Sequence, residues 1–161
     1  MLKKKFNKDK CVTCKHCMMA CAVRHSASQN IYEAASESPK PRYRLWVSLR
    51  KDKPFITVCQ NCVKPKCIPV CKDNAITKYD DGEVIIDPKK CTGCMDCVKV
   101  CAMGAIQANA ELNFAFQCDD CAGYDDMACV EACHTGALTY ADKAKAEAKE
   151  KAKAAPAPAT N

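Results

Sequence analysis

The stretch CVTCKHCMMAC, residues 11–21, contains four cysteines separated by two, two and three residues. The stretch CTGCMDCVKVC, residues 91–101, repeats this spacing. Two further stretches, residues 59–71 and 118–133, keep the opening C-x-x-C and the closing C-x-x-x-C but lengthen the middle. These four stretches, named motifs I to IV in chain order, contain all sixteen cysteines of the 161-residue sequence.

This spacing is typical of 4Fe-4S ligand runs, in which three cysteines bind one cubane and the fourth binds a neighbouring one. Two residues between ligands let the backbone curl around a cluster and point its N–H groups at the sulfur atoms, which helps to set the reduction potential. Four such runs predict four 4Fe-4S clusters. The sixteen expected iron ligands are Cys11, Cys14, Cys17, Cys21, Cys59, Cys62, Cys67, Cys71, Cys91, Cys94, Cys97, Cys101, Cys118, Cys121, Cys129 and Cys133.

Two other uses of cysteine fit less well. Structural zinc sites usually separate their cysteine pairs by a dozen or more residues, unlike the C-x-x-C-x-x-C triplets of motifs I and III. A disulfide scaffold needs an oxidising compartment, but residues 1–10, MLKKKFNKDK, have no apolar stretch for a secretory leader. We therefore expect a cytoplasmic protein, and no run of apolar residues predicts a membrane span.

The formal charge of +6 raises the possibility of nucleic-acid binding. Sixteen thiolates and four oxidised cubane cores change the charge of the loaded protein to about −2. No aromatic-plus-basic nucleic-acid module is present, so we expect no nucleic-acid partner. The alternative hypothesis is a structural four-cysteine zinc protein or a nucleic-acid-binding protein.

The segment between motifs I and II, residues 22–58, predicts a hairpin insert. Residues 42–49, RYRLWVSL, alternate apolar and polar side chains with period two, which favours a strand. Residues 50–54 form the expected turn, and residues 55–58 return as a second strand. The apolar face is Tyr43, Leu45, Val47 and Leu49, and the other face is Arg42, Arg44, Trp46 and Ser48. We expect a docking surface around Arg42, Arg44 and Trp46, with Lys51 and Lys53 in the turn.

Two more hairpins are predicted, one over residues 75–86 with Gly82 in its turn, the other pairing residues 105–109 with 114–117. A recurring tail follows three of the closing cysteines and predicts the start of a short strand: KDNAI, AMGAI and HTGAL at residues 72–76, 102–106 and 134–138. Residues 141–161 are rich in Lys, Ala, Glu and Pro, which predicts a frayed helix or a disordered tail.

The three histidines lie near predicted ligands. His25 and His134 follow closing cysteines, and each either hydrogen-bonds a sulfur or fills a polar surface. His16 lies inside the first ligand loop. Because cysteine fills every ligand position, we expect His16 to support the ligands rather than to bind iron.

With the four motifs placed, residues 8–140 resemble the four-cluster ferredoxin family. This family includes the iron–sulfur subunits of dimethyl sulfoxide reductase and the electron-transfer subunits of formate dehydrogenases and hydrogenases. The stretches CAVRHSAS (21–28) and PRYRLWV (41–47) look most like proteins that accompany carbon monoxide dehydrogenase and tungsten aldehyde oxidoreductases. The resemblance implies an α+β fold, a duplicated bacterial 2x4Fe-4S ferredoxin with small antiparallel hairpins and short helices around four cubanes, over residues 1–140.

In this family motif I shares clusters with motif IV, and motif II shares clusters with motif III. The resemblance therefore implies the ligand sets Cys11/Cys14/Cys17/Cys133, Cys118/Cys121/Cys129/Cys21, Cys59/Cys62/Cys67/Cys101 and Cys91/Cys94/Cys97/Cys71. The chain departs from the family in two places. Motif IV has a short middle loop, and the position directly after each closing cysteine is not proline.

The sequence holds no separate catalytic constellation, so we expect an electron-transfer subunit rather than an enzyme. Four clusters relay single electrons across a distance too long for one hop. The resemblance implies a catalytic partner of the tungsten aldehyde oxidoreductase, carbon monoxide dehydrogenase, formate dehydrogenase or hydrogenase type. It also implies a second electron carrier or subunit, or further copies of the chain itself.

Overall fold

The computed structural model describes residues 3–109 and 111–141, and all but the first residue of the predicted tail (141–161) lies outside this part. The described strands form four two-stranded antiparallel sheets. They pair β1 (Lys4–Phe6) with β8 (Leu138–Tyr140), β2 (Trp46–Arg50) with β3 (Lys53–Thr57), β4 (Ile76–Lys78) with β5 (Val84–Ile86), and β6 (Gln107–Asn109) with β7 (Phe114–Phe116). The helices are short: α1 (His16–Arg24), α2 (Ile31–Ala34), α3 (Asp96–Val100), α4 (Ala128–Glu131) and the 3-10 helix η1 (Lys8–Lys10).

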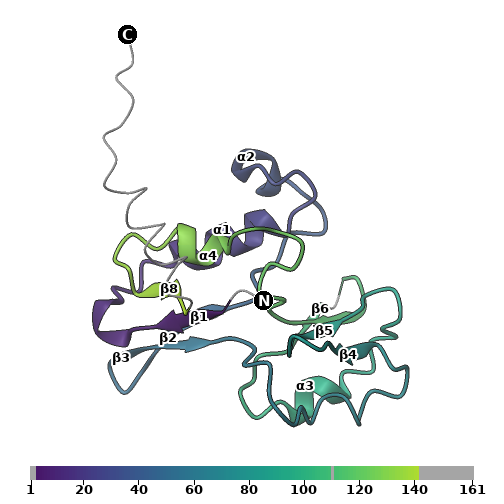
Figure 1. Cartoon of the computed structure of the whole chain (residues 1–161). Coiled ribbons are helices and arrows are strands. Elements are labelled where there is room, and N and C mark those ends of the chain that lie inside the picture. Colours follow the sequence, from purple (N-terminus) through teal and green to yellow (C-terminus); the bar gives the residue numbers. More distant parts are fainter. Residues whose placement is uncertain (1–2, 110, 142–161) are drawn as a thin grey trace.

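The buried residues form two separate cores (Figure 1). In the first, α1 and α4 lie side by side and cover the β1–β8 and β2–β3 pairs. Its buried members are Cys17, Cys21, Leu45, Val47, Val58, Cys118, Cys121, Met127, Cys129, Val130, Cys133, Ala137, Leu138 and Tyr140. The second core lies among α3 and the β4–β5 and β6–β7 hairpins, and its buried members are Ile76, Val84, Ile86, Cys97, Ile106 and Ala115. Because β1 pairs with β8, the first core is closed by the two ends of the described chain.

The hairpin predictions are confirmed with small shifts at their ends. The 75–86 hairpin has Gly82 in its turn at a φ of +92°, and the third hairpin pairs β6 with β7. The insert also forms a hairpin, but its first strand begins at Trp46 rather than at Arg42. Only Leu45 and Val47 of the predicted apolar face are buried, whereas Leu49 is exposed near the Lys51–Asp52 turn.

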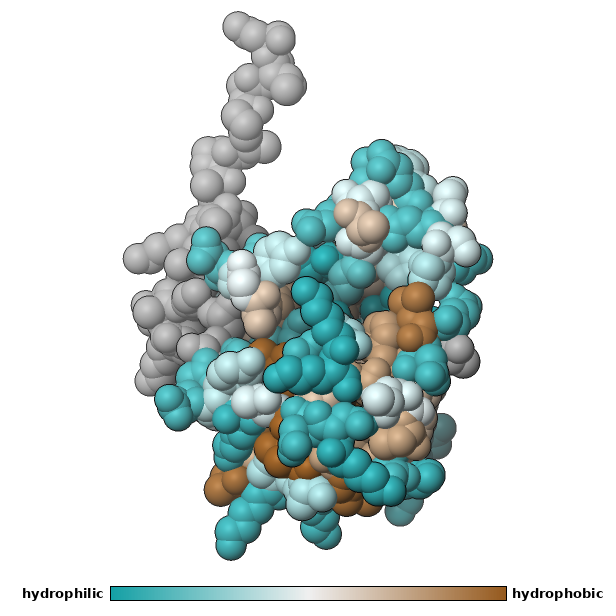
Figure 2. All heavy atoms as spheres, turned by 90° about the vertical axis from the view of Figure 1, so that its right-hand side faces the viewer, coloured by the Kyte–Doolittle hydropathy of each residue, from teal (hydrophilic) through white to brown (hydrophobic). Residues whose placement is uncertain are grey.

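This arrangement of few short helices and small antiparallel hairpins is the predicted α+β class and is compatible with a ferredoxin-like 4Fe-4S fold. Hydrophilic side chains cover most of the face in Figure 2, with small apolar patches between them. Among the described residues, no helix has the length and apolar character needed to cross a membrane.

Gly93, just before the second cysteine of motif III, gives a direct test of this packing. A Cβ at Gly93 would overlap the backbone oxygen and side chain of Asn113, and the φ of +77° disfavours any other residue. We expect Gly93→Ala to cost about 3 kcal/mol of unfolding free energy, the sum of overlap and backbone strain. Gly104→Ala, at a φ of +60° in open space, should cost about 1 kcal/mol. Thermal unfolding followed by circular dichroism checks this, and equal midpoints for the two variants would contradict it.

Candidate metal centres

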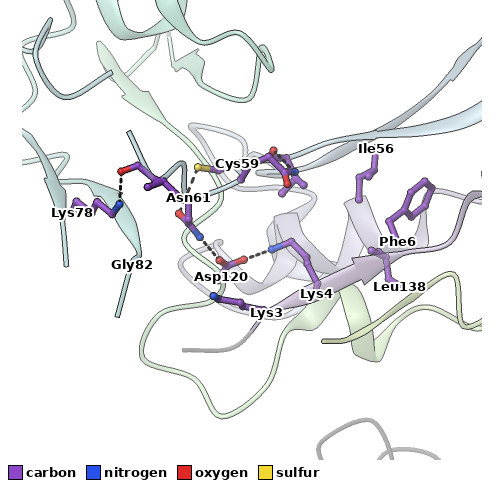
Figure 3. Close-up of a pocket in the computed structure, with 13 residues that line it drawn as sticks. Lys3, Lys4, Phe6, Ile56, Cys59, Asn61, Lys78, Gly82, Asp120 and Leu138 are labelled. Carbon is purple, nitrogen blue, oxygen red and sulfur yellow. Dashed lines mark hydrogen bonds and ion pairs between the residues drawn. The ribbon is translucent and has the colours of Figure 1, made fainter. Parts of the chain in front are cut away.

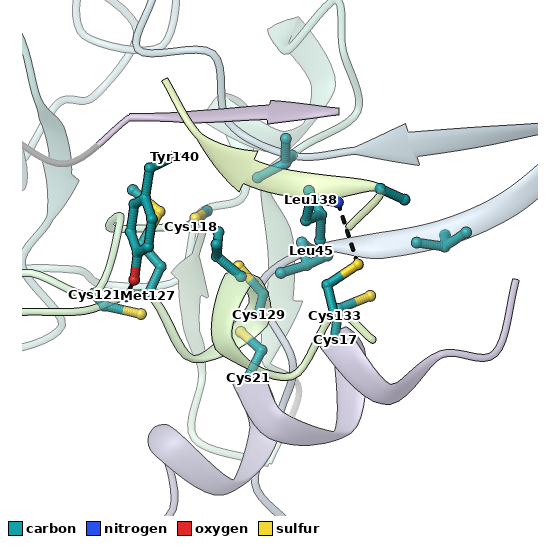
Figure 4. Packing of buried hydrophobic residues seen from close by; sticks show 14 residues of the cluster. Cys17, Cys21, Leu45, Cys118, Cys121, Met127, Cys129, Cys133, Leu138 and Tyr140 are labelled. Atoms are coloured by element: carbon teal, nitrogen blue, oxygen red, sulfur yellow. Dashed lines mark hydrogen bonds between the residues drawn. The ribbon is translucent and has the colours of Figure 1, made fainter. Parts of the chain in front are cut away.

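All sixteen cysteines lie in the part of the chain that the structure describes, and none of them forms a disulfide bond there. Thirteen of them belong to the two cores or pack against them, and the other three, Cys14, Cys62 and Cys94, are exposed. Figure 4 shows six of them between helices α1 and α4 and strand β8, and this group comprises Cys17, Cys21, Cys118, Cys121, Cys129 and Cys133. Motifs I and IV therefore meet in the first core, although about a hundred residues separate them.

Two groups of thiols in the first core combine cysteines from both motifs. Burial raises the pKa of the Cys17 thiol to about 11. Three neighbouring thiols add to this rise: Cys133, Cys14 and Cys11. Burial also raises the pKa of Cys129 well above its ordinary value. The thiols that add to that rise are Cys118, Cys21 and Cys121. Each group thus has three cysteines from one motif and the closing cysteine of the other.

The second core shows the same exchange between motifs II and III. Burial raises the pKa of Cys67, and the neighbouring thiols of Cys101 and Cys62 add to the rise. Burial also raises the pKa of Cys59 to about 11, with Cys67 and Cys62 among its neighbours, although Cys59 itself packs against the first core. For Cys97, whose pKa burial raises to about 11, the contributing thiols are Cys91, Cys94 and Cys71. The closing cysteines Cys101 and Cys71 are the members that come from the other motif.

The four ligand loops share one backbone feature. In every motif, the residue just before the second cysteine has a left-handed backbone, with φ between +45° and +77°. These residues are Thr13, Asn61, Gly93 and Asp120. A left-handed residue turns the chain sharply, so consecutive cysteines of a loop can face a common centre. In motifs I and III a second left-handed residue, Lys15 or Met95, then starts the helix that carries the third cysteine.

A backbone N–H group donates to the sulfur of each closing cysteine. The pairs are Arg44 to Cys21 at 3.2 Å, Ala75 to Cys71 at 3.3 Å, Ala105 to Cys101 at 3.3 Å and Leu138 to Cys133 at 3.2 Å. In motifs II, III and IV the residue three positions after the closing cysteine is left-handed: Asn74, Gly104 and Gly136. That turn brings back to the sulfur the next amide in motifs II and III and the amide two residues on in motif IV. The recurring tails KDNAI, AMGAI and HTGAL encode this turn and the strand or extended segment that follows it.

Motif I is different, because Cys21 lies within helix α1 and the insert supplies its amide donor. The Arg44 that provides this N–H also pairs its guanidinium with Asp119, between the first two cysteines of motif IV. Arg44, which the sequence predicts to belong to a docking surface, thus also supports the first core, since its side chain is about three-quarters buried and pairs with Asp119. Arg42, on the surface side of the insert, is half exposed. Trp46, on the same side, is partly buried.

His25 contacts a closing cysteine, one of its two predicted roles. Its Nδ1 lies 2.7 Å from the Cys21 carbonyl oxygen and 3.7 Å from the Cys21 sulfur, and its Nε2 lies 3.2 Å from Asp119. Burial opposes protonation of His25, but Asp119 and Cys21 outweigh it and raise the pKa to about 9. The other two histidines, His16 and His134, are exposed and pack edge to face, with ring centres 4.9 Å apart.

The described residues bring thiols together in groups of four but bring no three Cys, His, Asp or Glu side chains close enough around one point for a single metal ion. A cubane has an iron at each of four corners, so its cysteines bind different irons and stay apart. The donor set, four free thiols with an amide donor on one sulfur, fits that cofactor. A cluster binds cysteines as thiolates, so its binding would release the protons of the thiols.

One set of polar residues was missed by the sequence analysis. Lys4, in β1, is 8% exposed, pairs with Asp120, and its Nζ donates to the Cys118 sulfur at 3.3 Å. Asn61 Nδ2 donates to the other carboxylate oxygen of Asp120 at 2.6 Å. Asn61 and Asp120 occupy the same position in motifs II and IV, a signal that aligning the four loops would have found. Lys4 has no such local signal, because it contacts a residue more than a hundred positions away.

The chain is similar to known iron–sulfur and electron-transport proteins. Residues 53–143 match the family model described as a 4Fe-4S dicluster domain. The electron transport protein HydN of Escherichia coli is 32% identical over 153 residues, covering 85% of this chain and 86% of HydN. The probable anaerobic dimethyl sulfoxide reductase chain YnfG of the same species is 32% identical, covering 82% and 69%. A tetrathionate reductase subunit of Salmonella typhimurium is 29% identical, covering 83% of this chain and 54% of that relative.

Reversing the charge of Arg44 should disturb the first core. Arg44→Glu places a carboxylate against Asp119, and we expect a loss of about 2 kcal/mol in unfolding free energy together with lower iron content. Arg42→Glu is the matched control, because Arg42 is half exposed and lies 3.7 Å from Glu111. Thermal denaturation and iron analysis of both purified variants check this. Equal behaviour of the two variants would show that the Arg44–Asp119 pair does not support the site.

Proposed function

We propose that this chain, which belongs to the 4Fe-4S dicluster family of electron-transfer iron–sulfur proteins, carries four clusters and connects a catalytic oxidoreductase subunit to a second redox protein. The chain is the electron-transfer component of such a system and not its catalytic subunit. Bound 4Fe-4S clusters supply one-electron redox chemistry. The thiols, amides and charges of the chain would hold the clusters and shield them from solvent. They would also fix which cluster lies next to which.

The observation that carries the proposal is the exchange of closing cysteines between motifs. Each group of interacting thiols draws three members from one motif and one from its partner motif. The proposed ligand sets are Cys11/Cys14/Cys17/Cys133, Cys118/Cys121/Cys129/Cys21, Cys59/Cys62/Cys67/Cys101 and Cys91/Cys94/Cys97/Cys71. The repeated left-handed turns and amide-to-sulfur bonds support the same sets. Residues 1–140 would then be two ferredoxin-like modules, motifs I with IV and motifs II with III.

Exposure distinguishes one of these sets from the other three. The second cysteines Cys14, Cys62 and Cys94 are exposed, whereas Cys121 is 6% exposed. All four members of the set with Cys121 are buried. Electrons enter or leave where a partner can approach a ligand closely, so the sets with an exposed cysteine are the proposed points of exchange. The buried set is an internal relay.

The names of the relatives support a catalytic oxidoreductase subunit as the partner of this chain. HydN is an electron transport protein, and the other two relatives are components of a tetrathionate reductase and of a probable dimethyl sulfoxide reductase. We propose a catalytic oxidoreductase subunit as one partner, with the tungsten aldehyde oxidoreductase, carbon monoxide dehydrogenase, formate dehydrogenase and hydrogenase types as candidates. Sixteen free thiols fit a reducing compartment, so the proposal includes a cytoplasmic location.

Iron analysis tests the number of clusters. Protein purified without oxygen should contain about sixteen iron and sixteen acid-labile sulfide per chain, because four cubanes use four of each. It should be brown and bleach on reduction. About eight of each after reconstitution would leave two ligand sets empty, and a colourless zinc protein would reject the proposal.

Cross-ligation between motifs is tested by two substitutions in motif I. Cys21→Ser should perturb the paramagnetic signal of the cluster held mainly by motif IV, about a hundred residues away. Cys14→Ser is the matched control in the same motif, and it should perturb a different cluster, the one that includes Cys133. Electron paramagnetic resonance of the reduced proteins separates the two. Loss of the same signal in both variants would mean that motif I holds its cluster alone.

A further inference from the structure

Lys4 is a buried cation in direct contact with a cysteine sulfur of the first core. Its side chain is 8% exposed, and its ammonium donates to the Cys118 sulfur at 3.3 Å. The same ammonium pairs with Asp120, which is 6% exposed (Figure 3). The buried carboxylate of Asp120, in contact with this ammonium, favours the charged form of Lys4. Lys4 is therefore a fixed positive charge beside a proposed ligand.

Residues from the other half of the molecule hold this charge in place. Asn61 Nδ2 donates to Asp120 at 2.6 Å, while Asn61 Oδ1 accepts from the backbone N–H of Val84 in β5 at 3.0 Å. The Cys59 sulfur lies 3.6 Å from the same Asn61 oxygen. Figure 3 shows Lys4, Asp120, Asn61 and Cys59 in sequence along one wall of a cavity of about 410 Å³. The network thus runs from one proposed ligand set to another.

We propose that Lys4 is a positioning charge that makes the Cys118/Cys121/Cys129/Cys21 cluster easier to reduce than its buried surroundings alone would allow. The proposal rests on the ligand sets given under Proposed function. Reduction adds one negative charge to a cluster, and a nearby cation stabilises that added charge. The effect is large here because the cation and the four cysteines are buried, where water screens little.

The neighbours of Lys4 indicate that it acts on one set only. The Lys4 ammonium lies 3.3 Å from the sulfur of Cys118, a member of the fully buried set. Asp120 differs, because it lies 3.6 Å from the Cys118 sulfur and is also linked through Asn61 to Cys59, which belongs to another set. Removing Lys4 and removing Asp120 should therefore give different patterns among the four couples.

The test is a redox titration of the full chain with its clusters, followed by electron paramagnetic resonance. Lys4→Met removes the charge with little change in size, and Lys4→Arg keeps it. Lys5→Met is the matched control, since Lys5 is the next residue of β1 and is exposed. In Lys4→Met, one couple should become at least tenfold harder to reduce, about 59 mV for one electron. Lys4→Arg and Lys5→Met should leave all four couples near their wild-type potentials.

Several outcomes would overturn the inference. It fails if Lys4→Met leaves every couple unchanged, or if Lys5→Met gives the same shift. A wild-type chain with fewer than four clusters would instead reject the proposed function, so iron analysis keeps the two failures apart. If the Lys4→Met variant loses clusters, the redox titration of Asp120→Asn tests the inference instead. This substitution removes a charge of opposite sign and keeps the shape of the side chain. It should shift two couples to higher potential, and an unchanged titration in that variant also rejects the inference.

Discussion

A backbone amide donates to the sulfur of every closing cysteine, and much of the local structure exists to supply it. An amide stabilises a thiolate without adding a net charge, and it fixes the direction from which the sulfur can bind iron. Motifs II, III and IV make this bond locally with one left-handed residue three positions on. In motif I the donor belongs to the insert. The insert must therefore fold back over α1 before the Cys21 sulfur receives its amide hydrogen bond.

The closing cysteines also explain why so small a protein needs so few regular elements. Each proposed ligand set joins segments that the backbone alone would leave apart, as metals do in other small domains. Strands of three to five residues and helices of four to nine are then sufficient, because they only orient the loops. The pairing of β1 with β8 serves the same end, since it closes the core that contains motifs I and IV.

Much of this could be predicted from sequence because the signals are local. Cysteine spacing, the turn at Gly82 and the tails after Cys71, Cys101 and Cys133 are each encoded within a few residues. The pairing of Arg44 with Asp119 was not predicted, because period-two alternation assigns a face but not a partner, and Asp119 lies 75 residues away. Lys4 was missed for the same reason, since nothing near it in sequence distinguishes it from Lys3 or Lys5.

The buried Lys4–Asp120 pair is better explained by redox function than by stability. Removing two charges from water costs several kcal/mol per ion, so a buried ion pair is often no more stabilising than apolar residues of the same volume. This pair, moreover, lies beside the Cys118 sulfur, where any charge acts on a bound cluster, and Asn61 ties it to the neighbouring module. A chain that carries four anionic clusters must make each one reducible by the next. A fixed cation at the proposed internal set, whose four cysteines are buried, places its effect where solvent and mobile counterions contribute least.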